Sequence, residues 1–267
     1  MKYPQLYTSK PIITSGYSQP AFLKTSNLSI PKNHLQSVGI SHIKRFFPQK
    51  EKLTLEKLAK IDYRNGYHFK PQTTGDAISH RLVKFLRSFA DFYFQKDYLR
   101  RVIVLETVAA IPGLVGGMFR HLYSLRNMVD NGETIKALLE EAENERQHLL
   151  TFIEIGKPSF LDRVMIRFGQ YVFFNWYMLF YMLFPRVAHR FVGYLEEEAI
   201  HSYNGFEEEI LNGNIENVPA PQIAIDYWKL PSNSRLIDVV RAVRLDEAHH
   251  RDTNHRFANN KPFTLEK

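Results

Sequence analysis

The chemically richest stretch of the chain is residues 244–255, RLDEAHHRDTNH, which places six carboxylate or imidazole side chains in twelve positions. Within it, Glu247 and His250 stand three positions apart, as do Glu145 and His148 in EAENERQHL. Three residues turn an α-helix by about −60°, so both side chains of such a unit leave the same face. A bundle that binds two metal ions from inside uses this Glu-x-x-His unit twice, with one Glu from each of two further helices. The chain has no cysteine, so carboxylates and imidazoles would have to bind the metal.

A third Glu-x-x-His unit, Glu198 and His201 in EEEAIHSY, prevents spacing alone from selecting two units of the three. Glu-rich helices also produce the pattern by accident, so solvated helix faces are the alternative interpretation. Two observations argue against this alternative. Glu145 is followed by the apolar letters LLTFI, and four aliphatic residues precede the cluster in the last helix: Val239, Val240, Val243 and Leu245.

Length and charge divide the chain into two parts. The 267 residues, 44% of them hydrophobic, suffice for a large domain with a real core. Residues 1–50 hold seven Lys or Arg, no Asp or Glu, and many Ser, Thr and Pro. This composition favours an organelle transit segment, and an ordinary disordered basic arm is the alternative. We therefore expect a basic N-terminal arm at 1–50 and a helical domain at 51–267, with no pattern that suggests nucleic-acid binding.

Hydrophobic periodicity in the remainder predicts helices, and signals for strands are weak. The expected helices span residues 51–62, 75–94, 98–128, 133–155, 161–184, 189–211 and 233–258. Residues 217–228, NVPAPQIAIDYW, are expected to form a connector because of their prolines. Gly113, Gly116 and Gly117 follow Pro112 inside an apolar helix, where they either admit a neighbouring helix closely or mark a kink.

The aromatic run YVFFNWYMLFYMLF at residues 171–184 raises the question of a membrane. Its 14 residues fall short of the roughly 20 that a spanning helix needs. Four arginines flank it: Arg163, Arg167, Arg186 and Arg190. A helix lying in the bilayer interface fits this pattern, and a buried core helix is the alternative.

Four segments together resemble the conserved segments of the alternative oxidase family, in the family's order: LETVAAIPGLVGGM, EAENERQHL, FVGYLEEEAIHSY and RLDEAHHRDTNH. With their connectors they cover roughly residues 75–256. Members of that family are cyanide-insensitive ubiquinol oxidases of the mitochondrial inner membrane. The resemblance implies an all-α, ferritin-like four-helix bundle holding a di-iron site, with additional amphipathic helices for monotopic attachment to one leaflet. It also implies that two ubiquinol and one dioxygen give two ubiquinone and two water, without proton pumping.

The resemblance further assigns the iron ligands that spacing left open. It implies six: Glu106, Glu145, His148, Glu196, Glu247 and His250. Glu198 and His201 are then not the second unit. Tyr203 matches a redox-active tyrosine of the family, and it lies seven residues, about two helical turns, after Glu196. Without the resemblance, Tyr203 would be interpreted as a core tyrosine.

The resemblance also implies supporting roles for other residues. The implied quinol pocket contains Arg101, Leu105, Ala199 and Ser202, the last where relatives usually have threonine. Asn144 and Asp246 precede the two glutamates of the Glu-x-x-His units. Asp246 could hydrogen-bond a ligand imidazole, as supporting carboxylates commonly do, or be an ordinary surface residue. His121 and His189 match family histidines and are expected to serve structure or hydrogen bonding rather than iron.

The resemblance also sets expectations for partners and location. Ubiquinol and dioxygen are the expected substrates, one membrane leaflet the expected surface, and a homodimer the expected assembly. The mitochondrial inner membrane, or the membrane of a mitochondrion-derived organelle, is the expected site. Because the chain has no cysteine, control through a disulfide or a thiol is excluded.

Overall fold

The computed structural model describes residues 68–259, so the predicted helix 51–62 and the arm 1–50 lie outside the described residues. The described part is helical, apart from an isolated β-bridge between Pro219 and Arg235. Its helices are α3 (Thr74–Phe94), α4 (Tyr98–Asn127), α5 (Gly132–Ile155), α6 (Phe160–Leu183), α7 (Pro185–Leu211), α8 (Gln222–Trp228) and α9 (Leu236–Asn259). The all-α fold class predicted from the sequence is confirmed.

Two helices differ from the sequence-based expectation, and proline explains both differences. α7 begins at Pro185 rather than at residue 189, because proline's fixed φ suits the first helical turn and its missing N–H has no partner there in any case. α8 forms inside the stretch expected to be a connector, with Pro221 at its N-cap. It brings Trp228, which is fully buried, into the core.

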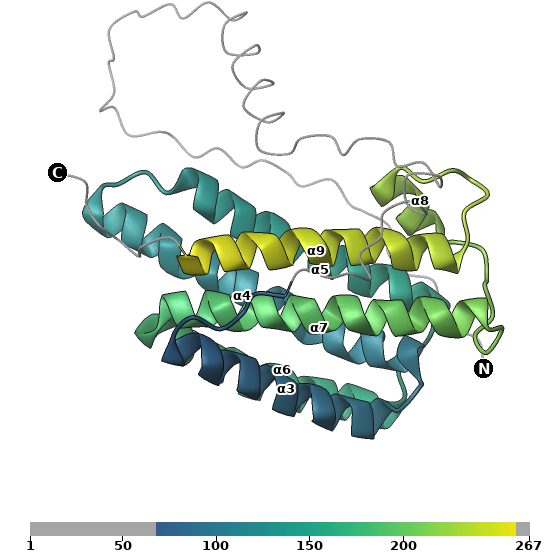
Figure 1. The fold of residues 1–267 in the computed structure, drawn as a ribbon. Coiled ribbons are helices and arrows are strands. Elements are labelled where there is room, and N and C mark those ends of the chain that lie inside the picture. The colour runs from purple at the N-terminus through teal and green to yellow at the C-terminus, as the bar shows by residue number, and fades with distance from the viewer. Residues whose placement is uncertain (1–67, 260–267) are drawn as a thin grey trace, which may run out of the picture. The chain divides into compact units, whose positions relative to one another are not determined.

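The long helices α4, α5, α7 and α9 form a four-helix bundle, in which α7 packs mainly on α9 and α4 mainly on α5. α3 packs against α7, and α6 packs against α4 and α7. In Figure 1, α3 and α6 lie together on one side of the bundle, and α9 lies on the opposite side. The two additional helices therefore cover one flank of the bundle.

Two separate hydrophobic clusters fill the bundle. The first includes Val102, Ile103, Phe152, Tyr203, Phe206, Trp228, Val239, Val240 and Val243. The second includes Phe69, Val83, Ile111, Val115, Tyr177, Tyr181, Phe191, Val192 and Tyr194. Along α4, Glu106 falls between the two clusters, and along α7 so does Glu196. A polar layer is thus held between two dry regions, which keeps bulk water from it.

Glycine lets α4 and α5 approach closely beside this layer. A Cβ atom added to Gly113 would lie 2.5 Å from the carbonyl oxygen of Leu138 and 3.1 Å from Cβ of Ala142. Any other residue would push the two helices apart. Pro112 lies inside α4 without ending the helix. The glycines following it therefore admit a neighbour, which was one of the two interpretations of this segment.

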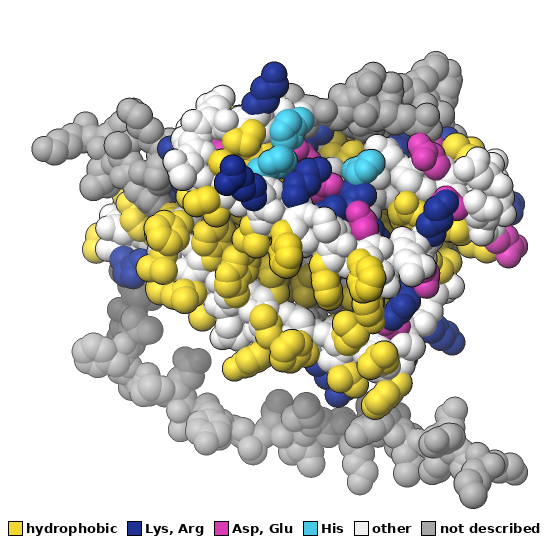
Figure 2. All heavy atoms as spheres, turned by 60° about the horizontal axis from the view of Figure 1, so that its bottom comes forward, with side chains coloured by type: hydrophobic (Ala, Val, Ile, Leu, Met, Phe, Trp, Pro, Cys, Tyr) yellow, Lys and Arg dark blue, Asp and Glu magenta, His cyan; other side chains and the backbone are white. Residues whose placement is uncertain are grey.

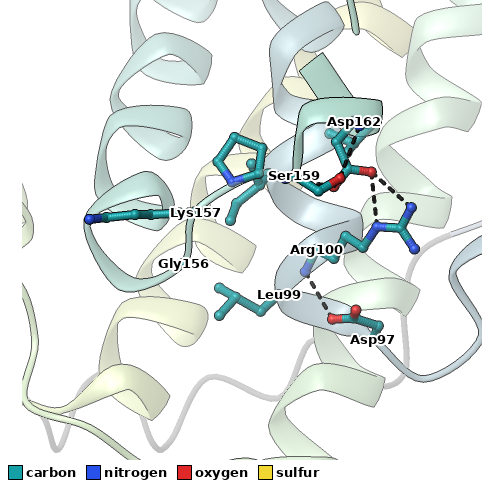
Figure 3. Close-up of a pocket in the computed structure, with 10 residues that line it drawn as sticks. Asp97, Leu99, Arg100, Gly156, Lys157, Ser159 and Asp162 are labelled. Carbon is teal, nitrogen blue, oxygen red and sulfur yellow. Dashed lines mark hydrogen bonds and ion pairs between the residues drawn. The ribbon is translucent and has the colours of Figure 1, made fainter. Parts of the chain in front are cut away.

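Capping boxes and ion pairs fix the two flanking helices. Asp162 completes the capping box of α6 with Ser159 and accepts hydrogen bonds from Nε and Nη2 of Arg100 at 3.0 and 2.8 Å. This pair borders a surface pocket of about 340 Å³ between the start of α4 and the α5–α6 connection (Figure 3). None of the side chains lining that pocket belongs to the predicted iron ligands or the predicted quinol pocket. The pair ties the start of α6 to α4.

A buried chain of hydrogen bonds crosses the bundle at His189. Its Nε2 lies 3.0 Å from the hydroxyl of Tyr181, and its Nδ1 lies 3.0 Å from Oδ1 of Asn254. The amide oxygen only accepts, so Nδ1 carries the proton and Nε2 accepts from the tyrosine. Burial lowers the pKa of His189 from 6.5 to about 4. The ring is therefore neutral in the folded protein at neutral pH.

This neutral ring predicts a pH dependence of stability. Between pH 6.5 and 4 the unfolded chain binds a proton at His189 that the folded chain does not, so the free energy of unfolding falls as the pH falls. The contribution is on the order of 3 kcal/mol over that window. Glutamine can replace both hydrogen bonds without titrating, so His189→Gln should show a shallower fall. Urea unfolding at a series of pH values checks this, and equal slopes for the two proteins would contradict it.

Candidate metal centre

Four acidic or imidazole side chains from three helices converge in the polar layer of the bundle. One ligand atom from each lies within 4.8 Å of those of the other three, and all four residues are buried: Glu106, Glu145, His148 and Glu247. Helical spacing explains the convergence, because each Glu-x-x-His unit presents both side chains on one face of α5 or α9. Glu106 reaches the same point from α4.

His250 and Glu196 adjoin this group. Nδ1 of His250 lies 2.7 Å from Oε1 of Glu145 and 3.7 Å from Oε2 of Glu247. Burial raises the pKa of Glu196 well above its usual range, and the nearby carboxylates of Glu247 and Glu145 raise it further. All six predicted ligands therefore lie in one cluster, with Glu196 contributed by α7.

The buried ligand atoms lack ordinary partners. Both carboxylate oxygens of Glu145, Oε2 of Glu106 and Nδ1 of His148 and of His250 have no hydrogen-bond partner of adequate geometry. Native proteins satisfy nearly all such buried atoms, so this many in one cluster calls for an explanation. Two divalent cations would satisfy them and would also balance four carboxylates. The donor set of oxygen and neutral imidazole nitrogen fits such ions.

The electrostatics of the cluster support the same conclusion. Burial and the neighbouring Glu145 carboxylate raise the pKa of Glu106 to about 8. Burial disfavours the charged form of His148, yet the carboxylate of Glu145 raises its pKa well above the usual range. Without a metal, protons must therefore neutralise part of the cluster. Metal binding would displace these protons, because carboxylate and imidazole ligands bind in their deprotonated forms.

Asp246 and its hydrogen-bond partners lie next to Nε2 of His148. Oδ2 of Asp246 lies 3.4 Å from Nε2 of His148 and accepts from Asn144 Nδ2 at 2.7 Å and from Trp228 Nε1 at 2.8 Å. Asn144 also donates to the hydroxyl of Tyr227 at 2.9 Å. The sequence indicated Asn144 and Asp246. Tyr227 and Trp228 were missed because they lie on α8, in the stretch expected to be a connector.

Tyr203 lies directly beside the cluster. It is buried, and its hydroxyl donates a hydrogen bond to Oε1 of Glu106. Burial and the Glu106 carboxylate raise the pKa of Tyr203 well above its usual range. The phenol is therefore protonated, next to the predicted ligands.

An ion network joins α3, α4 and α7 near the cluster. Nη1 of Arg101 donates to Asp91, Nε of Arg87 donates to the same carboxylate at 2.8 Å, and Nη1 of Arg87 donates to Glu198 at 2.7 Å. Of these four residues, the sequence indicated only Arg101. Arg87 and Asp91 could have been found as an i, i+4 ion pair on an apolar helix, whereas the contact with Glu198 joins distant parts of the chain.

The remaining indicated residues are placed as follows. Leu105 lies one helical turn after Arg101 and is 39% exposed, and Ser202 lies one turn after Glu198 with its hydroxyl buried and without a partner. Ala199 is partly buried beside Glu198. His121 is exposed, towards the end of α4. Three of these four stand on or beside the helix faces that carry the ion network, and His121 does not.

An all-α bundle that gathers four carboxylates and two imidazoles from four helices has the ligand inventory of the class of di-iron carboxylate bundles. Comparison with known families narrows this class. The alternative oxidase family matches residues 56–259 of the chain. The chain belongs to the alternative oxidase family.

Individual relatives agree with this assignment. A ubiquinol oxidase of Trachipleistophora hominis is 66% identical over 213 residues, which are 80% of this chain and 67% of the relative. A mitochondrial ubiquinol oxidase of Batrachochytrium dendrobatidis is 47% identical over 269 positions, 94% of this chain and 85% of the relative. The mitochondrial ubiquinol oxidase 1c of Arabidopsis thaliana is 57% identical over 188 residues, 70% of this chain and 57% of the relative. The chain thus spans little more than half of that plant protein.

The metal interpretation predicts the effect of removing one central ligand. Glu145→Ala should lower the metal bound per chain by at least about tenfold, because Glu145 contacts both imidazoles of the cluster. Glu143→Ala is the matched control, since Glu143 is exposed on the same helix and pairs with Arg146. Elemental analysis of the purified proteins makes the comparison. Equal metal content in the two variants would refute the assignment.

Proposed function

We propose that the chain is a ubiquinol oxidase that oxidises two ubiquinol and reduces one dioxygen to two water. The observation that carries this proposal is the cluster of four carboxylates and two imidazoles between two apolar clusters, in which five buried atoms of Glu106, Glu145, His148 and His250 lack hydrogen-bond partners. Membership of the alternative oxidase family, and relatives named ubiquinol oxidase, support ubiquinol as the substrate.

We propose two irons as the metal, bound by all six residues of the cluster. Glu106, Glu196 and the two Glu-x-x-His units supply the inventory that di-iron carboxylate bundles use. When bound, the irons would pass to dioxygen the electrons that two ubiquinol molecules supply. The protein's own contribution is to hold the ligands, exclude water through the flanking apolar clusters, and keep Asp246 behind His148.

Tyr203 is the proposed redox-active residue. Its hydroxyl donates to Glu106, and the same contact raises the pKa that keeps the proton on the phenol oxygen. The proton therefore sits one hydrogen bond from a metal ligand. An electron that passes from the ring towards dioxygen could be accompanied by passage of this proton to Oε1 of Glu106, and quinol would return both the electron and the proton to Tyr203.

The ion network of α3, α4 and α7 is the proposed site of the quinol head group. Arg101 is buried but its Nε has no partner, so it can donate to a quinol oxygen. Asp91 and Glu198 offer carboxylate oxygens that can accept hydrogen bonds from the quinol hydroxyls. Leu105, Ala199 and Ser202 would line the ring, with Leu105 open to the exterior.

We propose that the exposed apolar side chains of α3 and α6 bind one leaflet of the membrane. Figure 2 shows hydrophobic side chains gathered over this face, with charged side chains along one side of it. The exposed ones on the two helices include Ile78, Phe85, Phe89, Phe92, Phe160, Leu161, Phe168, Tyr171, Phe174, Leu179 and Met182. An apolar face of this extent on a soluble monomer is rare, and it would admit a long-tailed quinol from the lipid.

With 30 residues, α4 is long enough and apolar enough to cross a membrane. Its packing argues for a bundle helix instead. It packs along α5, which carries many charges, and it contributes Glu106 to the buried cluster. We therefore propose monotopic attachment, at the mitochondrial inner membrane or that of a mitochondrion-derived organelle. Attachment to one leaflet keeps all substrates on one side, so turnover is not coupled to proton pumping. A homodimer stays an expectation from the family, as do the boundaries of the arm and the oxidase domain.

Quinol-dependent oxygen uptake tests the proposed activity. The iron-loaded protein should consume one dioxygen per two molecules of short-chain ubiquinol, and cyanide should not inhibit it. Tyr203→Phe should lower kcat by at least about tenfold, because the phenol proton and electron are lost while the ring stays. Tyr171→Phe is the matched control, since Tyr171 is 72% exposed on α6.

Other outcomes would point elsewhere. Oxygen uptake driven by ferrous iron without quinol would favour a ferritin-like iron-storage protein or a soluble di-iron oxygenase. A protein that holds no iron and oxidises no quinol would be a non-catalytic helical protein of the membrane surface. Equal kcat values for the two tyrosine variants would remove Tyr203 from the reaction.

Membrane attachment predicts the effect of charging the apolar face. Phe89→Glu combined with Phe168→Glu should weaken partition into phosphatidylcholine vesicles by at least about tenfold, since each buried aromatic side chain contributes about 2 kcal/mol. Leu211→Glu is the control, because Leu211 is exposed on α7 outside this face. Co-sedimentation measures the bound fraction. Unchanged binding of the double variant would exclude this face as the membrane surface.

A further inference from the structure

The contacts between α5 and α9 follow one antiparallel register. Two pairs of predicted ligands define it: His148 with Glu247 at 3.3 Å, and Glu145 with His250 at 2.7 Å. One helical turn further along the same two faces, Glu141 meets Asn254, whose Nδ2 lies 3.0 and 2.9 Å from the two carboxylate oxygens. The pair Glu141–Asn254 is therefore the layer next to the predicted metal centre.

The two predicted imidazole ligands differ in the contacts that their outer ring nitrogens make. His148 has Asp246 at 3.4 Å from its outer nitrogen. For His250, none of the described contacts joins a carboxylate to the nitrogen that faces away from Glu145. Glu141 is linked to His250 indirectly, because the Asn254 Nδ2 that donates to Glu141 also donates to the backbone carbonyl of His250 at 3.1 Å. A single amide nitrogen thus contacts both residues.

The surroundings of Glu141 disfavour the ionised form of its carboxylate. It is 6% exposed, and among the described residues its hydrogen-bond donor is the neutral amide of Asn254. Burial raises its pKa to about 7, and the positive charge of a protonated His250 opposes this rise. A buried carboxylate without a cationic partner destabilises the fold, unless a charge nearby compensates for it.

The orientation of Asn254 is set from its other side. Its Oδ1 accepts from Nδ1 of His189, so its Nδ2 must point towards Glu141. An amide does not relay protons as a chain of hydroxyls or imidazoles does. This arrangement therefore holds the Glu141 carboxylate in place rather than conducting protons to it.

We propose that Glu141, held by Asn254, is a positioning residue that supports His250 at the metal centre, through the Asn254 amide that contacts both Glu141 and the backbone carbonyl of His250. The inference rests on the proposed di-iron function. Losing a residue that orients a metal ligand from behind typically costs 10- to 100-fold in metal affinity or activity.

The test uses the full-length, iron-loaded enzyme and four variants. Glu141→Leu removes the carboxylate, Glu141→Gln keeps one acceptor oxygen, and Asn254→Asp keeps the acceptor for His189 but removes the donor to Glu141. Glu140→Gln is the matched control, because Glu140 precedes Glu141 on α5 but lies outside the layer, 3.9 Å from Lys136. The readouts are the iron retained against a chelator, the Mössbauer spectrum of the iron-loaded protein, and urea unfolding of the iron-free protein.

We expect Glu141→Leu and Asn254→Asp to weaken iron retention by at least tenfold and to change the spectrum of one of the two iron sites. Glu141→Gln should be intermediate, and the control should match the wild type. The iron-free Glu141→Gln protein should be no less stable than the wild type, because a buried charge is removed. Variants that retain iron with unchanged spectra, or that lose only iron-free stability, would overturn this inference and leave the proposed function standing. A wild-type protein that binds no iron would instead overturn the proposed function.

Discussion

The structure depends on one electrostatic constraint: three carboxylates and two imidazoles are buried together beside the half-buried Glu196, and the ion pairs described for them join carboxylates to imidazoles. Removing this many charges from water destabilises the folded protein unless cations or protons compensate for them. Burial, and after it the neighbouring Glu145 carboxylate, raises the pKa of Glu106 to about 8. A metal centre would relieve both the repulsion between the carboxylates and the missing hydrogen bonds.

The rest of the bundle serves to place this cluster and keep it dry. Gly113 allows α4 to approach α5 so closely that Glu106 reaches the two Glu-x-x-His units. Hydrophobic clusters close the bundle on either side of the polar layer. Tyr203 donates a hydrogen bond to Glu106, and Arg101 lies on the same helix as Glu106 and contacts Asp91. In the proposed function, quinol would enter from the lipid at the ion network of Arg101.

Local patterns in the sequence predicted much of this. The period of the apolar residues predicted six of the helices, and the two Glu-x-x-His units indicated which faces of α5 and α9 turn inward. Spacing did not separate those units from Glu198 and His201, because a third unit on a Glu-rich helix has the same local geometry. In the structure Glu198 pairs with Arg87, and His201 is exposed. The resemblance to a family, rather than the spacing, selected the ligands.

What the sequence did not indicate arises from contacts between distant segments. Asp91 meets Arg101 across two helices, and Glu141 meets Asn254 across 113 positions. α8 was missed because its prolines indicate a loop as readily as a helix start. Each of these depends on how helices pack, which no local period encodes. The direct test of the account is crystallographic, with anomalous diffraction recorded on either side of the iron absorption edge. The account predicts two iron peaks between Glu106, Glu145, His148, Glu196, Glu247 and His250. Peaks elsewhere, or an iron-free cluster in active protein, would contradict it.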